Sequence, residues 1–245
     1  MGAIWAERAL LPGGWAEGVR VEIGADGRIA TVTPGTAPGG QRVELLLPAM
    51  ANLHSHAFQR AMAGLSEARG PHPRDTFWTW RQIMYRFLDH LTPEDVEAIA
   101  ALVQIEMLEA GYATNVEFHY LHHQPGGRPY DNLAEMSERI VAAAMQSGIG
   151  LTLLPVHYQF GGLDRRPLGP GQARFGTDPD GFVRLLDAAE AAQAPMPAEA
   201  GIGIAPKSLP EVRHDGLPLC TTLHPRRPLH RQLAEKIPEV AEVQA

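Results

Sequence analysis

The chain has 245 residues, of which 44% are hydrophobic and 20% are charged, and this composition excludes a disordered or fibrous chain. Its 21 Lys and Arg and 28 Asp and Glu give a net charge of −7. That balance argues against general nucleic-acid binding, which needs surplus cations to meet phosphates. The single cysteine, Cys220, excludes a disulfide framework and a cysteine-rich zinc module. The eleven histidines are unusual, and several lie close together.

No targeting segment is evident from the sequence. The first residues lack a basic stretch followed by a long apolar run, as a secretory signal requires. No window approaches the roughly 18 apolar residues of a membrane helix. We therefore expect a cytoplasmic protein with no membrane partner.

Residues 1–46 have the pattern of short strands and turns. Residues 19–23 alternate apolar and polar side chains, Asp26-Gly27 marks a hairpin turn, and residues 29–32 resume a strand. The stretch 33–40 is rich in Pro and Gly and is typical of a linker. We predict a small β-sandwich portion over 1–46, followed by a main domain over 47–245.

The main domain alternates between strand-like and helix-like segments. Four apolar runs have the length of buried strands: residues 45–50, 112–119, 149–155 and 202–206. Helix starts are marked by Thr92-Pro93, Asp131 and Asp178-Pro179, and Gly111 and Gly148 mark helix ends. This alternation predicts an α/β fold with a parallel sheet or barrel and helices outside it.

The number of strands predicts a partial barrel. A TIM-like (β/α) barrel takes about 250 residues, whereas here it starts near residue 45 and a fifth strand fits only near residue 228. We expect a barrel truncated to its first four or five strands. The Pro-rich stretch 211–228 has no apolar helical stripe, so it is either a long loop or a segment changed by divergence or a reading-frame error.

Polar residues follow the predicted strands, where chemistry belongs in such folds. His54 and His56 are two apart on an extended segment, so both imidazoles can face one metal ion, although a lone His-x-His is a weak signal. The segment from Glu117 to His123 holds three histidines; a second metal site is conceivable there, and hydrogen-bonded strand-end residues are the more ordinary interpretation. Glu235 can serve as a general acid and base, and by itself it is more typical of a surface residue.

Several longer blocks make the sequence resemble a known family. These are residues 47–64 (LPAMANLHSHAFQRAMAG), 77–81 (FWTWR), 106–112 (EMLEAGY), 117–123 (EFHYLHH) and 150–156 (GLTLLPV). Together they resemble the formimidoylglutamate deiminases of the amidohydrolase superfamily. The similarity extends almost continuously from Trp5 to about Ser208.

The resemblance implies a cytoplasmic enzyme with one zinc ion that hydrolyses N-formimidoyl-L-glutamate to N-formyl-L-glutamate and ammonia in histidine breakdown. It places His54 and His56 on two metal ligands and Glu235 on the acid–base residue. It places Gln59, Arg81 and Tyr120 on substrate-holding positions; an arginine suits a carboxylate because it can donate two hydrogen bonds. It also implies a homodimer for a full-length protein.

Three positions depart from the family pattern. Lys207 stands where the family has a substrate-facing histidine, Pro210 replaces an arginine, and Gln232 replaces a third metal-binding histidine. Because glutamine is a poorer zinc ligand than imidazole and later strands are lacking, we expect no ammonia release by this chain. Two alternatives stay open: another amidohydrolase deaminase, or a non-catalytic remnant that acts as a binding or folding module.

Overall fold

The computed structural model describes residues 2–67, 77–162, 164–207, 227–232 and 240. The chain divides into two compact units, Met1–Met50 and Ala51–Ala245. The candidate functional residues all belong to the second unit. Among the described residues, none of the helices has both the length and the apolar character needed to cross a membrane.

The first unit is a four-stranded sheet. Its strands are β1 (Gly2–Leu11), β2 (Gly14–Ile23), β3 (Ile29–Thr33) and β4 (Gln41–Leu46), in the order β3-β2-β1-β4. β1 is antiparallel to β2 and parallel to β4. Gly27, with φ of +78°, allows the predicted turn between β2 and β3. A sandwich needs a second sheet, so the β-sandwich assigned to residues 1–46 stays a prediction.

The second unit is built on a five-stranded sheet. Its strands are β5 (Met50–Ser55), β6 (Tyr112–His119), β7 (Gly150–His157), β8 (Gly201–Ile202) and β9 (Ala205–Pro206), and the order is β5-β6-β7-β8 with β9 also paired to β7. β7 is parallel to β6, β8 and β9. The parallel α/β character predicted from the sequence is therefore confirmed.

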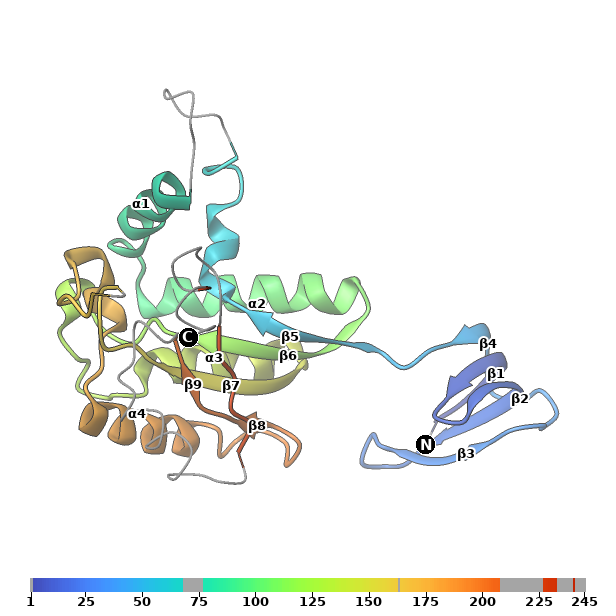
Figure 1. Ribbon diagram of the computed structural model, residues 1–245. Helices are drawn as coiled ribbons and strands as arrows, with labels where there is room; N and C mark the ends of the chain where they lie inside the picture. Colours follow the sequence, from blue (N-terminus) through green and yellow to red (C-terminus); the bar gives the residue numbers. More distant parts are fainter. Residues whose placement is uncertain (1, 68–76, 163, 208–226, 233–239, 241–245) are drawn as a thin grey trace. The chain divides into compact units, whose positions relative to one another are not determined.

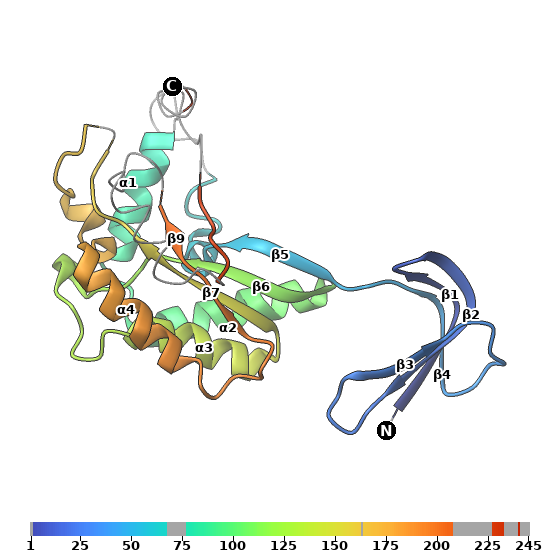
Figure 2. The same ribbon diagram turned by 60° about the horizontal axis from the view of Figure 1, so that its bottom comes forward.

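Within the described ranges this sheet is accompanied by the helices α1 (Phe77–Leu88), α2 (Pro93–Glu109), α3 (Glu135–Ser147) and α4 (Pro179–Ala192). Figures 1 and 2 show α2, α3 and α4 along one face of the strands. Short 3₁₀ helices η1 (Ala57–Met62), η2 (Pro125–Gly127) and η3 (Pro170–Phe175) follow strands or precede helices. The apolar residues of β7 and of the inner faces of α3 and α4 share one core.

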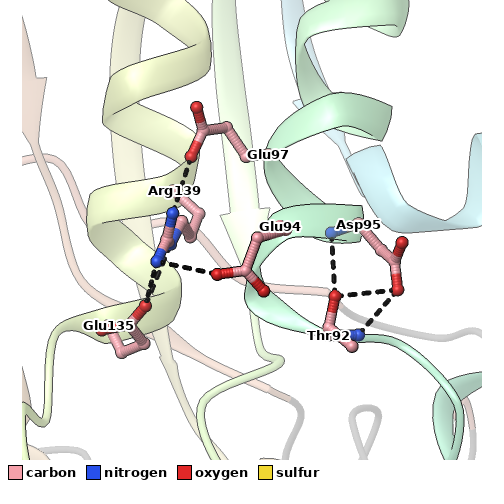
Figure 3. Close-up of polar contacts among 6 residues, drawn as sticks. All are labelled: Thr92, Glu94, Asp95, Glu97, Glu135 and Arg139. Carbon is pink, nitrogen blue, oxygen red and sulfur yellow. Dashed lines mark hydrogen bonds and ion pairs between the residues drawn. The ribbon is translucent and has the colours of Figure 1, made fainter.

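Helix α2 begins at the predicted signal. Thr92 is the N-cap: its hydroxyl accepts a hydrogen bond from the Asp95 amide (3.1 Å), and the Asp95 carboxylate accepts from the Thr92 amide (3.0 Å). This reciprocal pair satisfies two amides that the first helical turn leaves without helical partners. Figure 3 shows the pair at the start of α2.

Arg139 of α3 connects α3 to the N-terminal part of α2. Its guanidinium lies 2.7 Å from a carboxylate oxygen of Glu135, 3.0 Å from one of Glu97 and 3.3 Å from one of Glu94 (Figure 3). Hydrogen bonds from Arg139 to Glu135 and Glu97 are the main reason that the pKa of Arg139 is raised. One cation therefore offsets three carboxylates at the α2–α3 contact.

We expect Arg139→Met to lower the free energy of unfolding by about 1 kcal/mol at low ionic strength, because three carboxylates lose their shared cation. The effect should shrink in 1 M salt, where the screening length is about 3 Å. Urea unfolding at both salt concentrations measures this. Arg166→Met is the matched control, since Arg166 and Asp164 form an exposed pair. Equal losses in the two variants would contradict the prediction.

Three predicted boundaries are wrong. The helix expected from Asp131 begins at Glu135 with Ala134 as its N-cap, because Asn132 forms a preceding turn and its side-chain oxygen accepts from the Ala134 amide (3.0 Å). The apolar run 45–50 is not one barrel strand: β4 ends at Leu46, and β5 starts only at Met50. The strand expected at 202–206 is interrupted between β8 and β9. The Gly203 amide still donates to the Leu153 carbonyl of β7, whereas the Ile204 amide donates to the Pro228 carbonyl.

Candidate functional site

The His-x-His pair lies at the carboxyl end of β5: His54 belongs to the strand, and His56 directly follows it. The Nε2 atoms of His54 and His56 lie 3.1 Å apart. The intervening Ser55 is buried on the opposite side of the strand. The structure thus places both imidazoles together, as the spacing predicted.

Glu117 of β6 fixes the turn that follows His56. Its buried carboxylate accepts a hydrogen bond from the Ala57 amide (2.7 Å) and one from the Asn115 amide group (3.3 Å). Burial raises the pKa of Glu117 to about 7, while the hydrogen bonds from Ala57, Ser55 and Asn115 oppose that rise. Glu117 therefore fixes the backbone at Ala57, next to His56.

A segment far along the chain completes the cluster. The amide of Ile204 donates to the Pro228 carbonyl and the amide of His230 donates to the Ile204 carbonyl, both at 2.9 Å. These bonds bring the amide nitrogen of Gln232 to 2.8 Å from Nε2 of His54 and 3.1 Å from Nε2 of His56. A fifth strand was expected near residue 228; the described residues there form a single parallel bridge between Ile204 and Leu229.

A pocket of about 160 Å³ opens beside this cluster. It is lined by His56, Gln59, Phe77, Trp80, Arg81, Met84, Tyr120, Tyr158, Phe175, Lys207 and Gln232. Arg81 and Lys207 are cations, and none of the lining residues in the described part of the chain is a carboxylate. Apolar walls with a few convergent polar groups are typical of small-molecule sites, and the charges here favour an anionic ligand.

The three predicted substrate-holding residues lie in this pocket. Gln59, on η1, donates to the Tyr120 hydroxyl at 2.8 Å. Arg81, on α1, donates from Nη2 to the Tyr158 hydroxyl at 2.9 Å and from Nε to the Tyr85 hydroxyl. Burial raises the pKa of Tyr120, so its hydroxyl keeps its proton and can act as a donor.

Lys207 also reaches the pocket. Its ammonium lies 5.5 Å from the ring centroid of Phe118 and 5.8 Å from that of Tyr120, within the range of cation–π attraction. Its backbone amide donates to the His157 carbonyl at 3.0 Å, which places the residue directly after β9. Glu235 and Pro210 lie outside the described residues, so the acid–base role of Glu235 stays a prediction.

Sequence reasoning missed the wall residues of the pocket. Tyr158, Phe175, Trp80 and Met84 come from a strand end, η3 and α1, and aromatic residues at such positions are indistinguishable from core residues in a sequence. Tyr158 could have been predicted as a site residue. It directly follows β7, and binding sites in parallel α/β folds form at the carboxyl ends of the strands.

Three further histidines, His119, His122 and His157, are buried. His119 and His122 pack edge to face, with ring centroids 5.3 Å apart. Nδ1 of His157 lies 2.7 Å from the hydroxyl oxygen of Thr177. Burial lowers the pKa values of His119 and His157 to about 4. Across the described ranges no group of three or more His, Cys, Asp or Glu side chains is arranged to hold a metal ion, so the second metal site conceived for residues 117–123 is not formed there.

Comparisons with solved structures define the class of fold. A crystal structure of an amidohydrolase from Brucella melitensis superposes with a TM-score of 0.93 and 46% identity, covering 99% of this chain and 54% of that protein. A zinc-bound mutant of atrazine chlorohydrolase from Arthrobacter aurescens superposes with a TM-score of 0.75 at 17% identity, covering 97% of this chain and 54% of that protein. The chain has the amidohydrolase α/β fold, which confirms the predicted fold class.

Sequence comparison narrows the class. Over its whole length the chain is 47% identical to the formimidoylglutamate deiminase of Pseudomonas aeruginosa, of which it covers 54%. Residues 1–42 match the family description "Formimidoylglutamate deiminase HutF, N-terminal domain". The chain is therefore related to the formimidoylglutamate deiminases, as its sequence predicted, and it spans about half the length of the relatives it matches.

Proposed function

We propose that the pocket binds N-formimidoyl-L-glutamate, the compound that a full-length deiminase of this type would hydrolyse with zinc to N-formyl-L-glutamate and ammonia. The observation that carries this proposal is the placement of Arg81 and Lys207 beside His56, in a pocket whose described lining residues include no carboxylate. A dicarboxylate substrate requires such cations. The deiminase relative from Pseudomonas aeruginosa supports the choice of substrate.

The residues present fit a divalent metal ion: His54 and His56 are good ligands, and Gln232 is a weaker one. The Nε2 atoms of His54 and His56 face one point, and the third group at that point is the amide of Gln232. When bound, zinc would supply Lewis-acid activation of the attacking water. The protein's own residues would hold the substrate: Arg81 would donate to a carboxylate, and Tyr120 would donate through its hydroxyl.

Binding tests the proposal directly. Titration of the zinc-supplemented chain with N-formyl-L-glutamate should change tryptophan fluorescence, because Trp80 lines the pocket. We expect Arg81→Met to weaken binding roughly ten- to a hundredfold, since a hydrogen bond to a charged group contributes about 1.5–3 kcal/mol. Arg128→Met is the control; Arg128 is exposed and donates to Gln124, away from the pocket. Absent binding, or equal binding by both variants, would contradict the proposal.

Ammonia release distinguishes the alternatives. Because Gln232 and Lys207 replace family histidines, we expect binding without measurable release from N-formimidoyl-L-glutamate, which is the behaviour of a non-catalytic binding module. Zinc-dependent release would instead establish hydrolysis by this chain. Faster release from a ring amine such as 8-oxoguanine would favour another deaminase; the 8-oxoguanine deaminase of Pseudomonas aeruginosa is 31% identical over 83 residues.

A further inference from the structure

We propose that Gln232 is itself a metal ligand, through its amide oxygen Oε1, in a centre shared with Nε2 of His54 and Nε2 of His56. The inference rests on the metal dependence of the proposed function, and it departs from the family pattern, which has a histidine at this position. It predicts a centre whose preference for zinc over manganese is smaller than that of a three-histidine centre.

The hydrogen bonds of His56 and Gln232 determine which nitrogens are available. Nδ1 of His56 lies 3.1 Å from the Phe118 carbonyl oxygen, and because a carbonyl only accepts, Nδ1 carries the proton and Nε2 has a lone pair. The amide group of Gln232 has two hydrogens and lies within hydrogen-bond distance of Nε2 on both histidines. Two lone pairs therefore point at one place.

His230 holds the ring of His54 in this orientation. Nδ1 of His54 lies 2.8 Å from Nε2 of His230, and the two rings are nearly parallel, with centroids 5.0 Å apart and planes 21° apart. With Nε2 of His54 accepting from Gln232, Nδ1 carries the proton and donates to His230. A partner on the second nitrogen is what fixes the orientation of a metal-binding imidazole, so we assign His230 as a positioning residue.

The oxygen of the Gln232 amide supplies the decisive observation. Oε1 is buried and has no hydrogen-bond partner. A buried acceptor without a partner costs about 1–3 kcal/mol. A half-turn of the amide plane exchanges its NH₂ and its oxygen at nearly identical shape. A cation at the meeting point of the two lone pairs would repel the NH₂ and attract Oε1, which would give the oxygen its missing partner.

The spacing and the ligand types suit this assignment. The three facing side-chain atoms are 2.8, 3.1 and 3.1 Å apart. Neighbouring ligands of a tetrahedral zinc with bonds of about 2.0–2.1 Å lie about 3.3 Å apart. An amide oxygen is a harder donor than imidazole, and oxygen donors favour Mn²⁺ relative to zinc. The preference for zinc over manganese should therefore be smaller here than with a third histidine.

Metal titration of the full chain tests the assignment. The metal-stripped protein is titrated calorimetrically with ZnCl₂ and with MnCl₂, and the visible spectrum of bound Co²⁺ reports its ligands. We expect Gln232→Leu to weaken both metals on the order of tenfold, and Gln232→His to tighten zinc by a similar factor while changing manganese less. Gln59→Leu is the control, because Gln59 lies in the same pocket and bonds Tyr120 instead.

Two results would overturn the inference. One is an unchanged affinity and Co²⁺ spectrum in Gln232→Leu, and the other is the absence of metal binding by the unmodified chain. Misfolding cannot imitate the tighter zinc binding expected of Gln232→His. Metal binding through Gln232 without binding of N-formyl-L-glutamate would leave this inference standing and contradict only the proposed function.

Discussion

Replacing Arg174 with methionine is expected to lower the free energy of unfolding by about 3 kcal/mol or more. Arg174 lies on η3 and is only 2% exposed. Its guanidinium donates to the carbonyls of His123 (2.7 Å) and Leu91 (3.1 Å) and also to that of Leu88. Each hydrogen bond from a charged donor contributes roughly 1.5–3 kcal/mol, against which the cost of burying the charge must be set.

Urea unfolding followed by circular dichroism measures this effect. Arg184→Met is the matched control, because Arg184 is exposed on α4, and surface substitutions usually change stability by less than about 0.5 kcal/mol. Arg174→Lys keeps the charge but lacks the planar fork, so it should recover only part of the loss. If Arg174→Met unfolds at the same urea concentration as the control, the guanidinium is not what holds these three carbonyls.

The buried histidines are expected to make the fold sensitive to acid. Burial lowers the pKa values of His119 and His157 to about 4 from 6.5, although Asp178 partly opposes this at His157. Between pH 6.5 and 4 the unfolded chain therefore binds more protons at these sites than the folded one, so stability falls as the pH falls. At pH 5 the loss is about 2 kcal/mol for each histidine relative to pH 8.

Glu117 acts in the opposite direction. Burial raises its pKa to about 7 from 4.5, so the folded state binds this proton more readily, and its contribution to stability grows as the pH falls from 7. We expect His119→Gln or His157→Gln to reduce the difference in unfolding free energy between pH 8 and pH 5, and Glu117→Gln to enlarge it. His90→Gln, at an exposed histidine, is the control. Unchanged differences in all variants would refute this charge assignment.

Local signals in the sequence predicted those elements whose ends are fixed by local contacts. Thr92-Pro93 set the start of α2, and β6 has the predicted bounds Tyr112–His119. The start of α3 was missed because Asn132 caps a turn before the helix, and Asp and Asn signal turns and helix caps alike. The run 45–50 was misread because apolar content alone does not reveal where one strand ends and the next begins.

The parts of the site formed by residues close together in the sequence were predictable. The parts formed by residues far apart in the sequence were not. The spacing of His54 and His56 predicted their common direction. No local pattern could show that His230 lies within hydrogen-bond distance of His54, because this depends on the hydrogen bonds between Ile204 and the segment 228–230. The pocket walls from α1 and η3 likewise depend on tertiary packing.

The long chain separation within the histidine–glutamine cluster has a kinetic consequence. His54 and Gln232 are 178 residues apart, whereas β6, α3 and β7 are consecutive in the chain and pack together. Closing a longer loop costs more entropy, and contacts between distant residues form late for that reason. The strand–helix–strand core can therefore assemble while the cluster is still incomplete, and ligand sites would appear only in the final stage of folding.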